Sequence, residues 1–176
     1  MSRHTLSVLV ENKPGVLTRV AGLFARRGFN INSLAVGPTE RPAVSRITVV
    51  VNVDQRPLEQ VTKQLNKLVN VLKVVELDDS EGSVQRDLLL IKVKANSSQR
   101  AEVTQVVDLF RAHIVDVSAE TMVIEATGTD SKLTAMLKLL EPFGLVELVK
   151  SGTVGISRGE RPMQDRGNKI ALISGL

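Results

Sequence analysis

Apolar and polar positions along this chain follow the same order of periodicities twice. In the first 78 residues, alternation with a period of two predicts a half-buried strand, and an apolar stripe at helical spacing predicts the helix that follows it. Two more strands, a second helix and a closing strand complete this first unit. The segments expected in it are a strand over 5–10, a helix over 14–27, strands over 30–36 and 43–53, a helix over 57–70 and a strand over 71–77.

The polar segment 79–86, which has no apolar periodicity, is predicted to be a linker. The order of elements then starts again, although the two halves share almost no residue identity. The segments expected in the second unit are a strand over 87–95, a helix that begins near 96–98, strands over 114–117 and 122–126, a helix that begins near 130–131 and ends at Pro142, and a strand over 144–150. The predicted organisation is a domain over 1–78, a linker over 79–86, a domain over 87–158 and a tail over 159–176.

The order β-α-β-β-α-β predicts the α+β class, with two ferredoxin-like units that each hold a four-stranded antiparallel sheet and two helices on one face. Such a sheet leaves its other face without helices and one strand edge open unless something pairs with it. Units of about 80 residues also bury only a modest core. Association through an edge or a face would cover both features, so the pattern predicts a dimer or a larger assembly.

Composition narrows the function classes. Hydrophobic residues make up 43% of the chain and charged residues 24%, which is the balance of a soluble globular protein. The longest apolar runs are too short to cross a bilayer, and the N-terminus has no secretory signal pattern, so we expect a cytoplasmic protein without a membrane partner. The absence of cysteine excludes disulfides, thiolate metal sites and cysteine nucleophiles.

Aromatic residues are scarce, with four Phe and no Trp or Tyr. Little aromatic surface is therefore left for stacking bases. We interpret the net charge of +4 as solvated surface and expect no nucleic acid partner.

Residues suited to catalysis are few. The two histidines, His4 and His113, lie in no zinc-binding spacing, and the chain has no nucleophile elbow, Walker loop or dinucleotide fingerprint. The glycines within 151–155 lack the Lys-Ser/Thr and the following helix of a phosphate loop. We therefore expect no catalytic residue, no metal site and no cofactor in this chain.

One segment has the character of a binding site. Residues 11–17 run from the first strand into the first helix, and a helix N-terminus presents free N–H groups that attract a carboxylate. Pro14 lacks an N–H, but those of Gly15, Val16 and Leu17 remain, and Gly15 permits close approach of a ligand to the backbone. Asn12 offers a donor and an acceptor, which suits the ammonium and carboxylate of an amino acid. The alternative is that Asn12 is a turn residue and Gly15 is incidental.

A second segment follows the end of the first helix. Gly28 is expected just beyond the last helical residue, and Asn30 and Ile31 lie at the entry to the next strand. From the residues alone, asparagine at such a bend is interpreted as turn chemistry.

Together these stretches resemble the ACT-domain family, and more closely the small regulatory subunits of acetolactate synthase. The similarity spans about residues 3–159, in order and at matching spacing. The residues that carry it are LSVLVENKPGVL at 6–17, GLFARRGFNINSL at 22–34, PTE at 38–40, SR at 45–46, QLNKLVNV at 64–71 and SGTVGISRG at 151–159. The resemblance implies an N-terminal ACT domain and a C-terminal ACT-like domain.

The resemblance also implies a non-catalytic subunit that regulates a separate catalytic subunit. That partner would hold thiamine diphosphate, FAD and magnesium and condense 2-oxoacids in branched-chain amino acid biosynthesis. The small subunit would raise its activity and confer feedback inhibition by valine, or by leucine or isoleucine. In such subunits the effector lies between the ACT domains of a homodimer. One domain contributes the segment that matches Asn12–Leu17, and the other contributes the segment that matches Asn30 and Ile31.

The second unit departs from this pattern, because Asn96-Ser97-Ser98 has neither the proline nor the glycine of Asn-x-Pro-Gly. We expect this unit to be structural or to contact the partner, with no effector of its own, and we assign no role to residues 160–176. Two other hypotheses stay open: a regulator of the ACT type that binds nucleic acid directly, and an enzyme that turns over pyruvate by itself.

Overall fold

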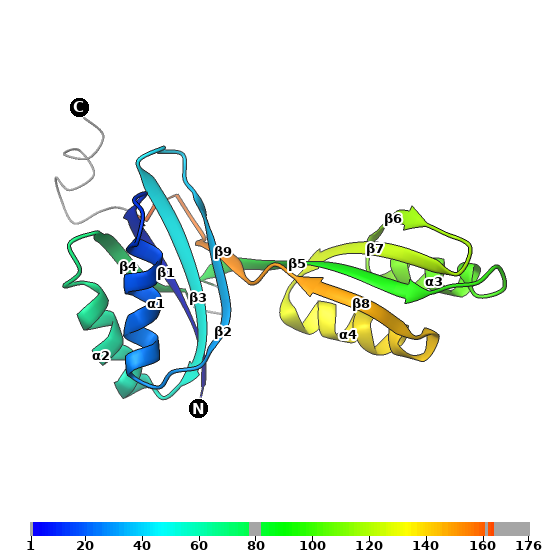
Figure 1. The fold of residues 1–176 in the computed structure, drawn as a ribbon, viewed down its shortest axis with the longest axis horizontal. Coiled ribbons are helices and arrows are strands. Elements are labelled where there is room, and N and C mark those ends of the chain that lie inside the picture. The colour runs from blue at the N-terminus through cyan, green and yellow to red at the C-terminus, as the bar shows by residue number, and fades with distance from the viewer. Residues whose placement is uncertain (1, 78–81, 161, 164–176) are drawn as a thin grey trace. The chain divides into compact units, whose positions relative to one another are not determined.

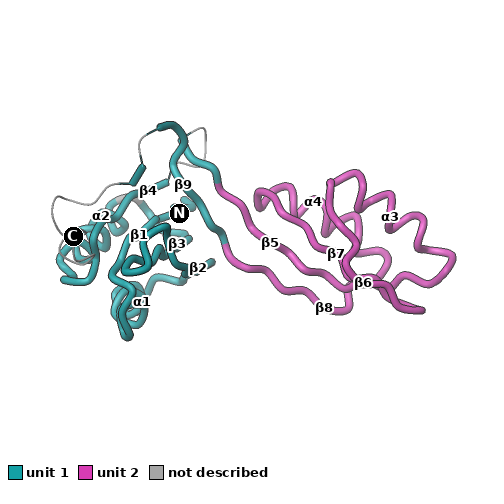
Figure 2. Tube along the Cα trace, turned by 90° about the horizontal axis from the view of Figure 1, so that it is seen from above, with its two compact units in different colours: residues 1–84, 153–176 teal, residues 85–152 magenta. Residues whose placement is uncertain are grey.

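The computed structural model describes residues 2–77, 82–160 and 162–163. The chain divides into two compact units, the first formed by residues 1–84 with 153–176 and the second by residues 85–152 (Figure 2). Each unit has the predicted order of strands and helices around an antiparallel sheet. The predicted α+β class with two ferredoxin-like units is therefore confirmed.

The first unit contains a four-stranded antiparallel sheet with the strand order β2-β3-β1-β4. Its elements are β1 (Ser2–Glu11), α1 (Val16–Arg26), β2 (Ile31–Pro38), β3 (Val44–Val53), α2 (Gln55–Leu65), β4 (Val71–Leu77), the start of β5 (Ser83–Lys94) and β9 (Val154–Ser157). The helices α1 and α2 lie side by side on one face of this sheet (Figure 1).

The core of the first unit lies between the sheet and these two helices. Alternate residues of β1, which are Leu6, Val8 and Val10, are buried there together with Val20 and Phe24 of α1. The strand and helix stripes predicted for this part of the chain are therefore confirmed.

The end of α1 also follows the prediction. The N–H of Gly28 donates to the carbonyl of Ala25 and the N–H of Phe29 donates to the carbonyl of Phe24, each at 3.0 Å. This pair of bonds closes a helix on a left-handed residue, and Gly28 has a φ of +69°. Glycine adopts that conformation without a clash at Cβ, which is why it stands here.

The face of this sheet without helices is partly covered by the end of the same chain. Ser7 of β1 is fully buried, and its hydroxyl donates to the sulfur of Met163 at 3.5 Å. The backbone N–H of Thr153 donates to Ser33 Oγ at 2.7 Å, and Met163 packs against a small cluster that contains Leu9. Residues 153–158, predicted for the second domain, and Met163, predicted for the tail, thus pack within the first unit.

The second unit repeats the arrangement with the sheet order β6-β7-β5-β8. Its further elements are α3 (Arg100–Leu109), β6 (His113–Val117), β7 (Thr121–Gly128), α4 (Asp130–Leu140), the 3-10 helix η1 (Glu141–Phe143) and β8 (Leu145–Lys150). Alternate residues of β5, which are Leu89, Ile91 and Val93, are buried in a core with Val103 of α3 and Leu133 of α4.

An ion-pair cluster joins three elements of this unit. The carboxylate of Asp87 on β5, only 4% exposed, lies 2.9 Å from the ammonium of Lys150 on β8, which also donates to Asp130 at the start of α4. Partial burial lowers the pKa of Lys150, but the hydrogen bonds and charges of the two carboxylates outweigh it and raise the pKa above its ordinary value of 10.5. The cluster ties β5, β8 and α4 together.

The start of β5 differs from the prediction. This strand begins at Ser83, inside the predicted linker 79–86, and β9 pairs with it although no strand is predicted after residue 150. The N–H of Arg158 donates to the carbonyl of Gly82 at 3.0 Å, so the pairing extends to the end of β9. Val154 and Ile156 alternate in β9, but two apolar positions are too few to predict a strand. Residues 79–81 of the predicted linker, and residues 161 and 164–176 of the predicted tail, lie outside the described residues.

The second-unit helices begin at other residues than predicted. Thr129 caps α4 through a hydroxyl that accepts from the N–H of Lys132 at 3.4 Å, whereas Asp130 and the residue after it lie inside the helix. At α3, the side-chain oxygen of Asn96 accepts from the N–H groups of Ser98 and Gln99, and the helix starts only at Arg100. Both starts use a short polar side chain, as such positions favour.

Candidate functional site

Asn12 stands directly after β1 and is fixed by the loop between β2 and β3. Its backbone N–H donates to the carbonyl of Ala43 at 2.8 Å, and its side-chain Nδ2 donates to the carbonyl of Pro42 at 3.1 Å. The side-chain oxygen accepts no hydrogen bond from the part of the chain that the structure describes, and the residue is exposed. Asn12 therefore presents an oriented acceptor to solvent at the start of α1.

Gly15 is the N-cap of α1 and adopts a left-handed conformation, with φ +82° and ψ −10°. A side chain is disfavoured at this φ, which explains the glycine in physical terms. A Cβ built on Gly15 would meet no atom within 4 Å, so the space in front of the helix end is open. Both features let another molecule approach the backbone.

The N-terminus of α1 has free donors. No side chain caps this end, and no acidic residue lies in its first turn. Within the described residues, the N–H groups of Gly15, Leu17 and Thr18 have no hydrogen-bond partner, while that of Val16 donates weakly to the carbonyl of Lys13 at 3.4 Å. Uncapped N–H groups and the positive end of the helix dipole together favour an anion. The sequence predicted free N–H groups at Gly15, Val16 and Leu17, of which that of Val16 is weakly bonded. It missed Thr18, which its place in the first helical turn could have indicated.

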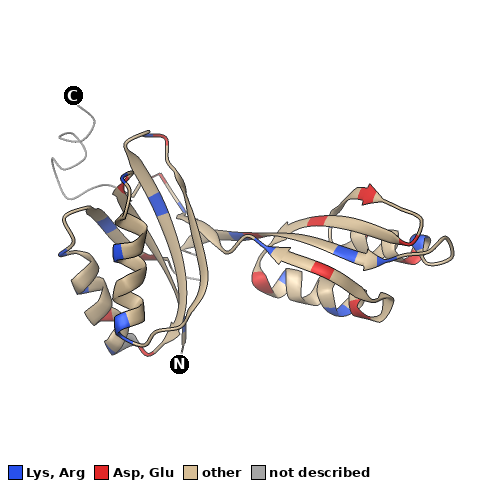
Figure 3. Cartoon of the chain, viewed as in Figure 1, with Lys and Arg blue, Asp and Glu red and all other residues tan. Residues whose placement is uncertain are grey.

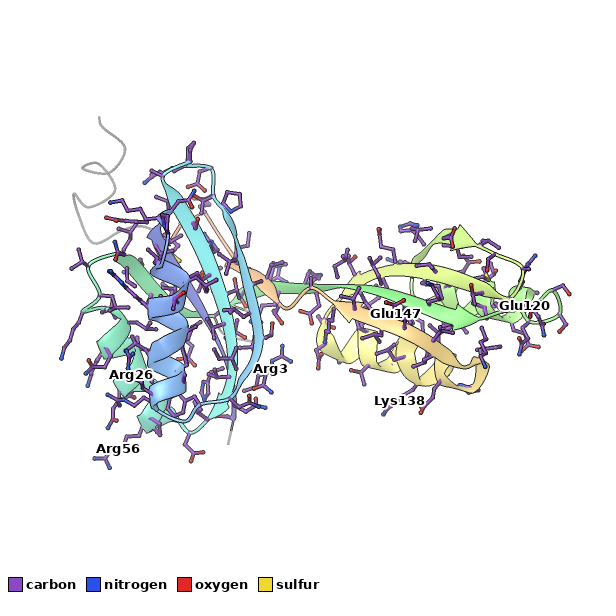
Figure 4. All side chains as sticks on the ribbon, in the orientation of Figure 1. Arg3, Arg26, Arg56, Glu120, Lys138 and Glu147 are labelled. Atoms are coloured by element: carbon purple, nitrogen blue, oxygen red, sulfur yellow. The ribbon has the colours of Figure 1, made fainter. Side chains whose placement is uncertain are left out.

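Charges around this end favour a carboxylate further. Glu11 is the acidic residue beside it, and one of its oxygens lies 2.9 Å from both Lys13 Nζ and Asn70 Nδ2. The guanidinium of Arg19 donates to Asn70 Oδ1 at 2.9 Å. The helix itself carries Arg19 and Arg26 and no acidic residue (Figures 3 and 4). The nearby negative charge of Glu11 is thus paired with Lys13, and the first turn of the helix adds none.

The side chains of Val16 and Leu17 point to different surroundings. Val16 is buried in the core of the first unit, so its side chain contacts the sheet and not a ligand at the helix end. Leu17 is 41% exposed and offers an apolar surface beside the free N–H groups. Of these two predicted site residues, only Leu17 can contact a bound molecule through its side chain.

Asn30 and Ile31 lie at the opposite end of α1. Asn30 is exposed and makes no hydrogen bond to the described residues, while Ile31 is half-buried against the core at the start of β2. The eleven residues of α1 separate the two predicted segments by about 16 Å at 1.5 Å per residue. One copy of the first unit therefore does not bring Asn12 and Asn30 together.

A shallow recess of about 480 Å³ lies elsewhere in the first unit and includes none of the six predicted residues. It is lined by Arg27, Gln60, Lys63, Gln64, Asn66 and Lys67.

No helix within the described ranges has the length and apolar character to span a membrane. In that same part of the chain, His, Asp and Glu form no group of three that could hold a metal ion.

Two protein families match this chain, one over each half of the sequence. The family described as an AHAS small subunit-like ACT domain matches residues 6–73. The family described as the small subunit of acetolactate synthase matches residues 86–159. The two matches divide the chain close to the start of β5.

Similar proteins carry the same description over nearly the whole chain. The acetolactate synthase small subunit of Mycolicibacterium smegmatis is 60% identical over 158 residues, which cover 90% of this chain and 92% of that protein. The small subunit of Mycobacterium leprae is 59% identical over 158 residues, with 90% and 93% covered. A crystal structure of the acetolactate synthase small subunit from Thermotoga maritima matches with a TM-score of 0.84 and 43% identity, covering 92% of this chain and all of that one.

Proposed function

This chain belongs to the family of acetolactate synthase small subunits, and we propose that it regulates a separate catalytic subunit through an amino acid bound at α1. Its relatives bear the name of a small subunit and its first unit is an ACT domain, which supports a regulatory role. In this proposal the chain raises the activity of its partner and makes that activity sensitive to valine, leucine or isoleucine. The partner supplies the catalytic residues and holds thiamine diphosphate, FAD and magnesium.

The observation that carries the proposal is the uncapped start of α1. Three N–H groups, those of Gly15, Leu17 and Thr18, are free among the described residues, and the space above Gly15 is open. A carboxylate placed there accepts two or three N–H bonds at the positive end of the helix dipole. The free oxygen of Asn12 accepts from the ammonium of the same amino acid.

The apolar side chain of the effector needs walls, which one ACT domain supplies only in part. Leu17 offers one wall beside the donors, and Ile31 and Asn30 lie at the far end of the helix. We propose that a second copy of this chain contributes Asn30 and Ile31, so that the site is completed in a homodimer. This arrangement accounts for the separation of the two segments within one copy.

Magnitudes limit the selectivity of such a site. One methylene in an apolar pocket changes binding by about 1–3 kcal/mol. Valine, leucine and isoleucine are therefore expected to overlap in affinity. Lysine is rejected more strongly, because its ammonium would be buried against an apolar wall.

Isothermal titration calorimetry of the full chain tests the site. Valine, leucine and isoleucine are titrated separately, with lysine as a control for the apolar wall and valinamide as a control for the carboxylate. We expect saturable heat with at least one branched-chain amino acid, none with lysine, and binding at least tenfold weaker with valinamide, because each charged hydrogen bond contributes about 1.5–3 kcal/mol. Equal affinity for valine and valinamide would show that the N-terminus of α1 does not bind the carboxylate.

Pyruvate turnover by the catalytic subunit tests the regulatory role. Addition of this chain is expected to raise turnover, and addition of the bound amino acid is expected to lower it again. The chain alone should turn over no pyruvate. If the chain leaves both the rate and its sensitivity to amino acids unchanged, the regulatory proposal is wrong.

A further inference from the structure

The strand β8 lies at the margin of the second unit's sheet, beside β5 and with no further strand next to it in the described ranges (Figure 1). Four of its six residues are apolar and exposed: Leu145 (41%), Val146 (51%), Leu148 (44%) and Val149 (59%). Edge strands of soluble proteins ordinarily carry charges, prolines or bulges that prevent pairing. An edge strand with four exposed apolar residues is suited to pairing with another protein segment.

The apolar residues of β8 lie on both faces of the sheet. Leu148 is opposite Ile91, a core residue of this unit, so Leu148 lies on the face that the helices cover. Val149 is opposite Leu90 and lies on the other face. A helix packed on one face would leave the other face exposed, whereas an added strand contacts side chains on both. The segment that fits this edge is therefore extended.

The two charged residues of β8 are paired within their own unit. Glu147, labelled in Figure 4, lies 3.6 Å from Lys92 on β5. Lys150 is held by Asp87 and Asp130. Lys150 is therefore neutralised within its own unit, and Glu147, which is 75% exposed, has a cation beside it.

The backbone of β8 presents hydrogen-bonding groups to the open side. The N–H of Ser151 donates to the carbonyl of Leu88 at 2.9 Å, which continues the register that pairs Lys150 with Leu89. Because inward and outward groups alternate in an antiparallel ladder, Val149 and Glu147 also bond toward β5. The N–H and C=O of Leu148, which lies between them, face the open edge.

We propose that β8 pairs in antiparallel fashion with β8 of a second copy of this chain, about a two-fold axis at Leu148. A two-fold pair of neighbouring strands places residues of the same sheet face opposite each other, and an outward-facing residue on the axis exchanges two N–H···O bonds with its copy. Leu148 meets both conditions. Each Glu147 is then opposite Val149 of the other copy, whereas an axis at Glu147 would oppose two carboxylates.

The other margin of this sheet, β6, is less suited to pairing. It has five residues, includes the charged Asp116 and shifts register between Ile114 and Asp116. Such bulges and charges block edge pairing. β8 also shifts register, at Val146, but Glu147, Leu148 and Val149 stay in regular register with β5. The pairing segment is thus the regular part of β8.

Single cysteines in the full chain test this axis, and they are unambiguous because the natural chain has no cysteine. In the proposed pair, the two copies of residue 148 lie about 5.5 Å apart between Cα atoms, which a disulfide can bridge. Val146→Cys is the matched control, because Val146 is similarly exposed on the same strand but would lie about 14 Å from its copy. Under mild oxidation, Leu148→Cys is expected to form a disulfide-linked dimer at least tenfold faster than Val146→Cys. Equal rates, or no dimer from a folded Leu148→Cys chain, would overturn the proposal.

Hydrogen exchange of the unmodified chain gives a second measurement. The amide of Leu148 has no strand partner in its own unit, so its exchange reports pairing with another molecule. We expect this amide to exchange at least tenfold more slowly at high than at low protein concentration, while Val149 stays protected at both. Fast exchange of Leu148 at every concentration contradicts the pairing. Neither measurement involves the effector site, so each outcome is independent of the proposed function.

Discussion

The first helix of each unit starts at the same place in the fold, but the two starts differ in the charges and side chains around their free backbone donors. At α1, Gly15 is left-handed, no side chain caps the helix, and the first turn has no acidic residue. At α3, Asn96 accepts the N–H groups of Ser98 and Gln99, and Glu102 lies in the first turn. The N–H groups of Ala101 and Glu102 also have no hydrogen-bond partner among the described residues, but the carboxylate of Glu102 in the same turn disfavours a second anion. The start of α1, which has no acidic residue in its first turn, is therefore the better candidate for binding an anion.

The largest predicted effect comes from adding a carboxylate to each of these loops. Gly15→Asp puts a negative charge at the position proposed for the ligand's carboxylate, and we expect the affinity for the branched-chain amino acid to fall more than 100-fold in calorimetry. Ser98→Asp, in the equivalent loop of the second unit, should leave the affinity unchanged. Gly15→Asn separates charge from backbone strain, because asparagine also tolerates a positive φ. If Gly15→Asn weakens binding as much as Gly15→Asp, charge is not the cause.

The next largest effect concerns the ion-pair cluster of the second unit. Lys150→Met leaves the carboxylate of Asp87 buried without its cation, and we expect the free energy of unfolding of this unit to fall by about 2–3 kcal/mol. Hydrogen exchange of the core strand β5 measures this loss for the second unit alone. Lys92→Met is the control, because its partner Glu147 is 75% exposed and the change should stay below about 0.5 kcal/mol. Similar losses of stability in both variants would mean that the pairs of Lys150 stabilise the second unit no more than an exposed ion pair does.

The same cluster gives the second unit a dependence on pH. The pKa of Lys150 is raised in the folded state, so the folded chain binds the proton of Lys150 more tightly than the unfolded chain does. Its contribution is complete below the ordinary pKa of 10.5 and is lost as the pH rises through the folded pKa. The stability difference between the natural chain and Lys150→Met should therefore narrow above pH 10.5. A constant difference across that range contradicts the assignment.

A smaller effect tests the far end of α1. Asn30→His replaces an exposed amide with a bulkier ring, and we expect the amino acid to inhibit the complex about tenfold more weakly, with activation of the catalytic subunit retained. Asn32→His is the matched control, since Asn32 is also exposed on β2 but belongs to no proposed contact. Loss of activation together with inhibition would indicate failed assembly instead.

The smallest effect concerns the covered face of the first sheet. Met163→Ala removes a half-buried side chain from the cluster with Leu9, and we expect a loss of about 1 kcal/mol in the stability of the first unit, measured by hydrogen exchange of β1. Val154→Ala, at an exposed position of β9, should change this stability by less than about 0.5 kcal/mol. Equal effects would mean that Met163 contributes no packing of its own.

Local patterns predicted most of the fold. The alternation at Leu6, Val8 and Val10 and the stripe at Val20 and Phe24 are properties of single elements, and the structure buries them as expected. The beginning of β5 is mostly polar, and β9 has only four residues, with Val154 and Ile156 as its apolar pair, so neither pattern is long enough to predict a strand. The two segments are held by pairing with each other across 75 residues of sequence. Non-local hydrogen bonds leave no periodicity in a sequence.

The candidate site shows the same limit. The spacing from Asn12 to Leu17 indicated a helix end, but the φ of Gly15 and the bonds from Asn12 to the loop at 42–43 depend on tertiary structure. The sequence also assigned Val16 to the site, although its apolar character equally suits the core, where its side chain lies. The residue type alone does not distinguish a valine in the core from a valine that contacts a ligand.

The return of residues 153–163 to the first unit has a consequence for the synthesis of this chain. Domains generally fold as units from the N-terminus while the chain is being made. Here the second unit, residues 85–152, is complete before Met163 exists to cover Ser7 and Leu9 and before Thr153 exists to bond Ser33. The strands of the ACT domain are thus synthesised before the second unit, but its sheet is covered on both faces only afterwards, and a chain that terminates before Met163 would expose the face of that sheet opposite the helices.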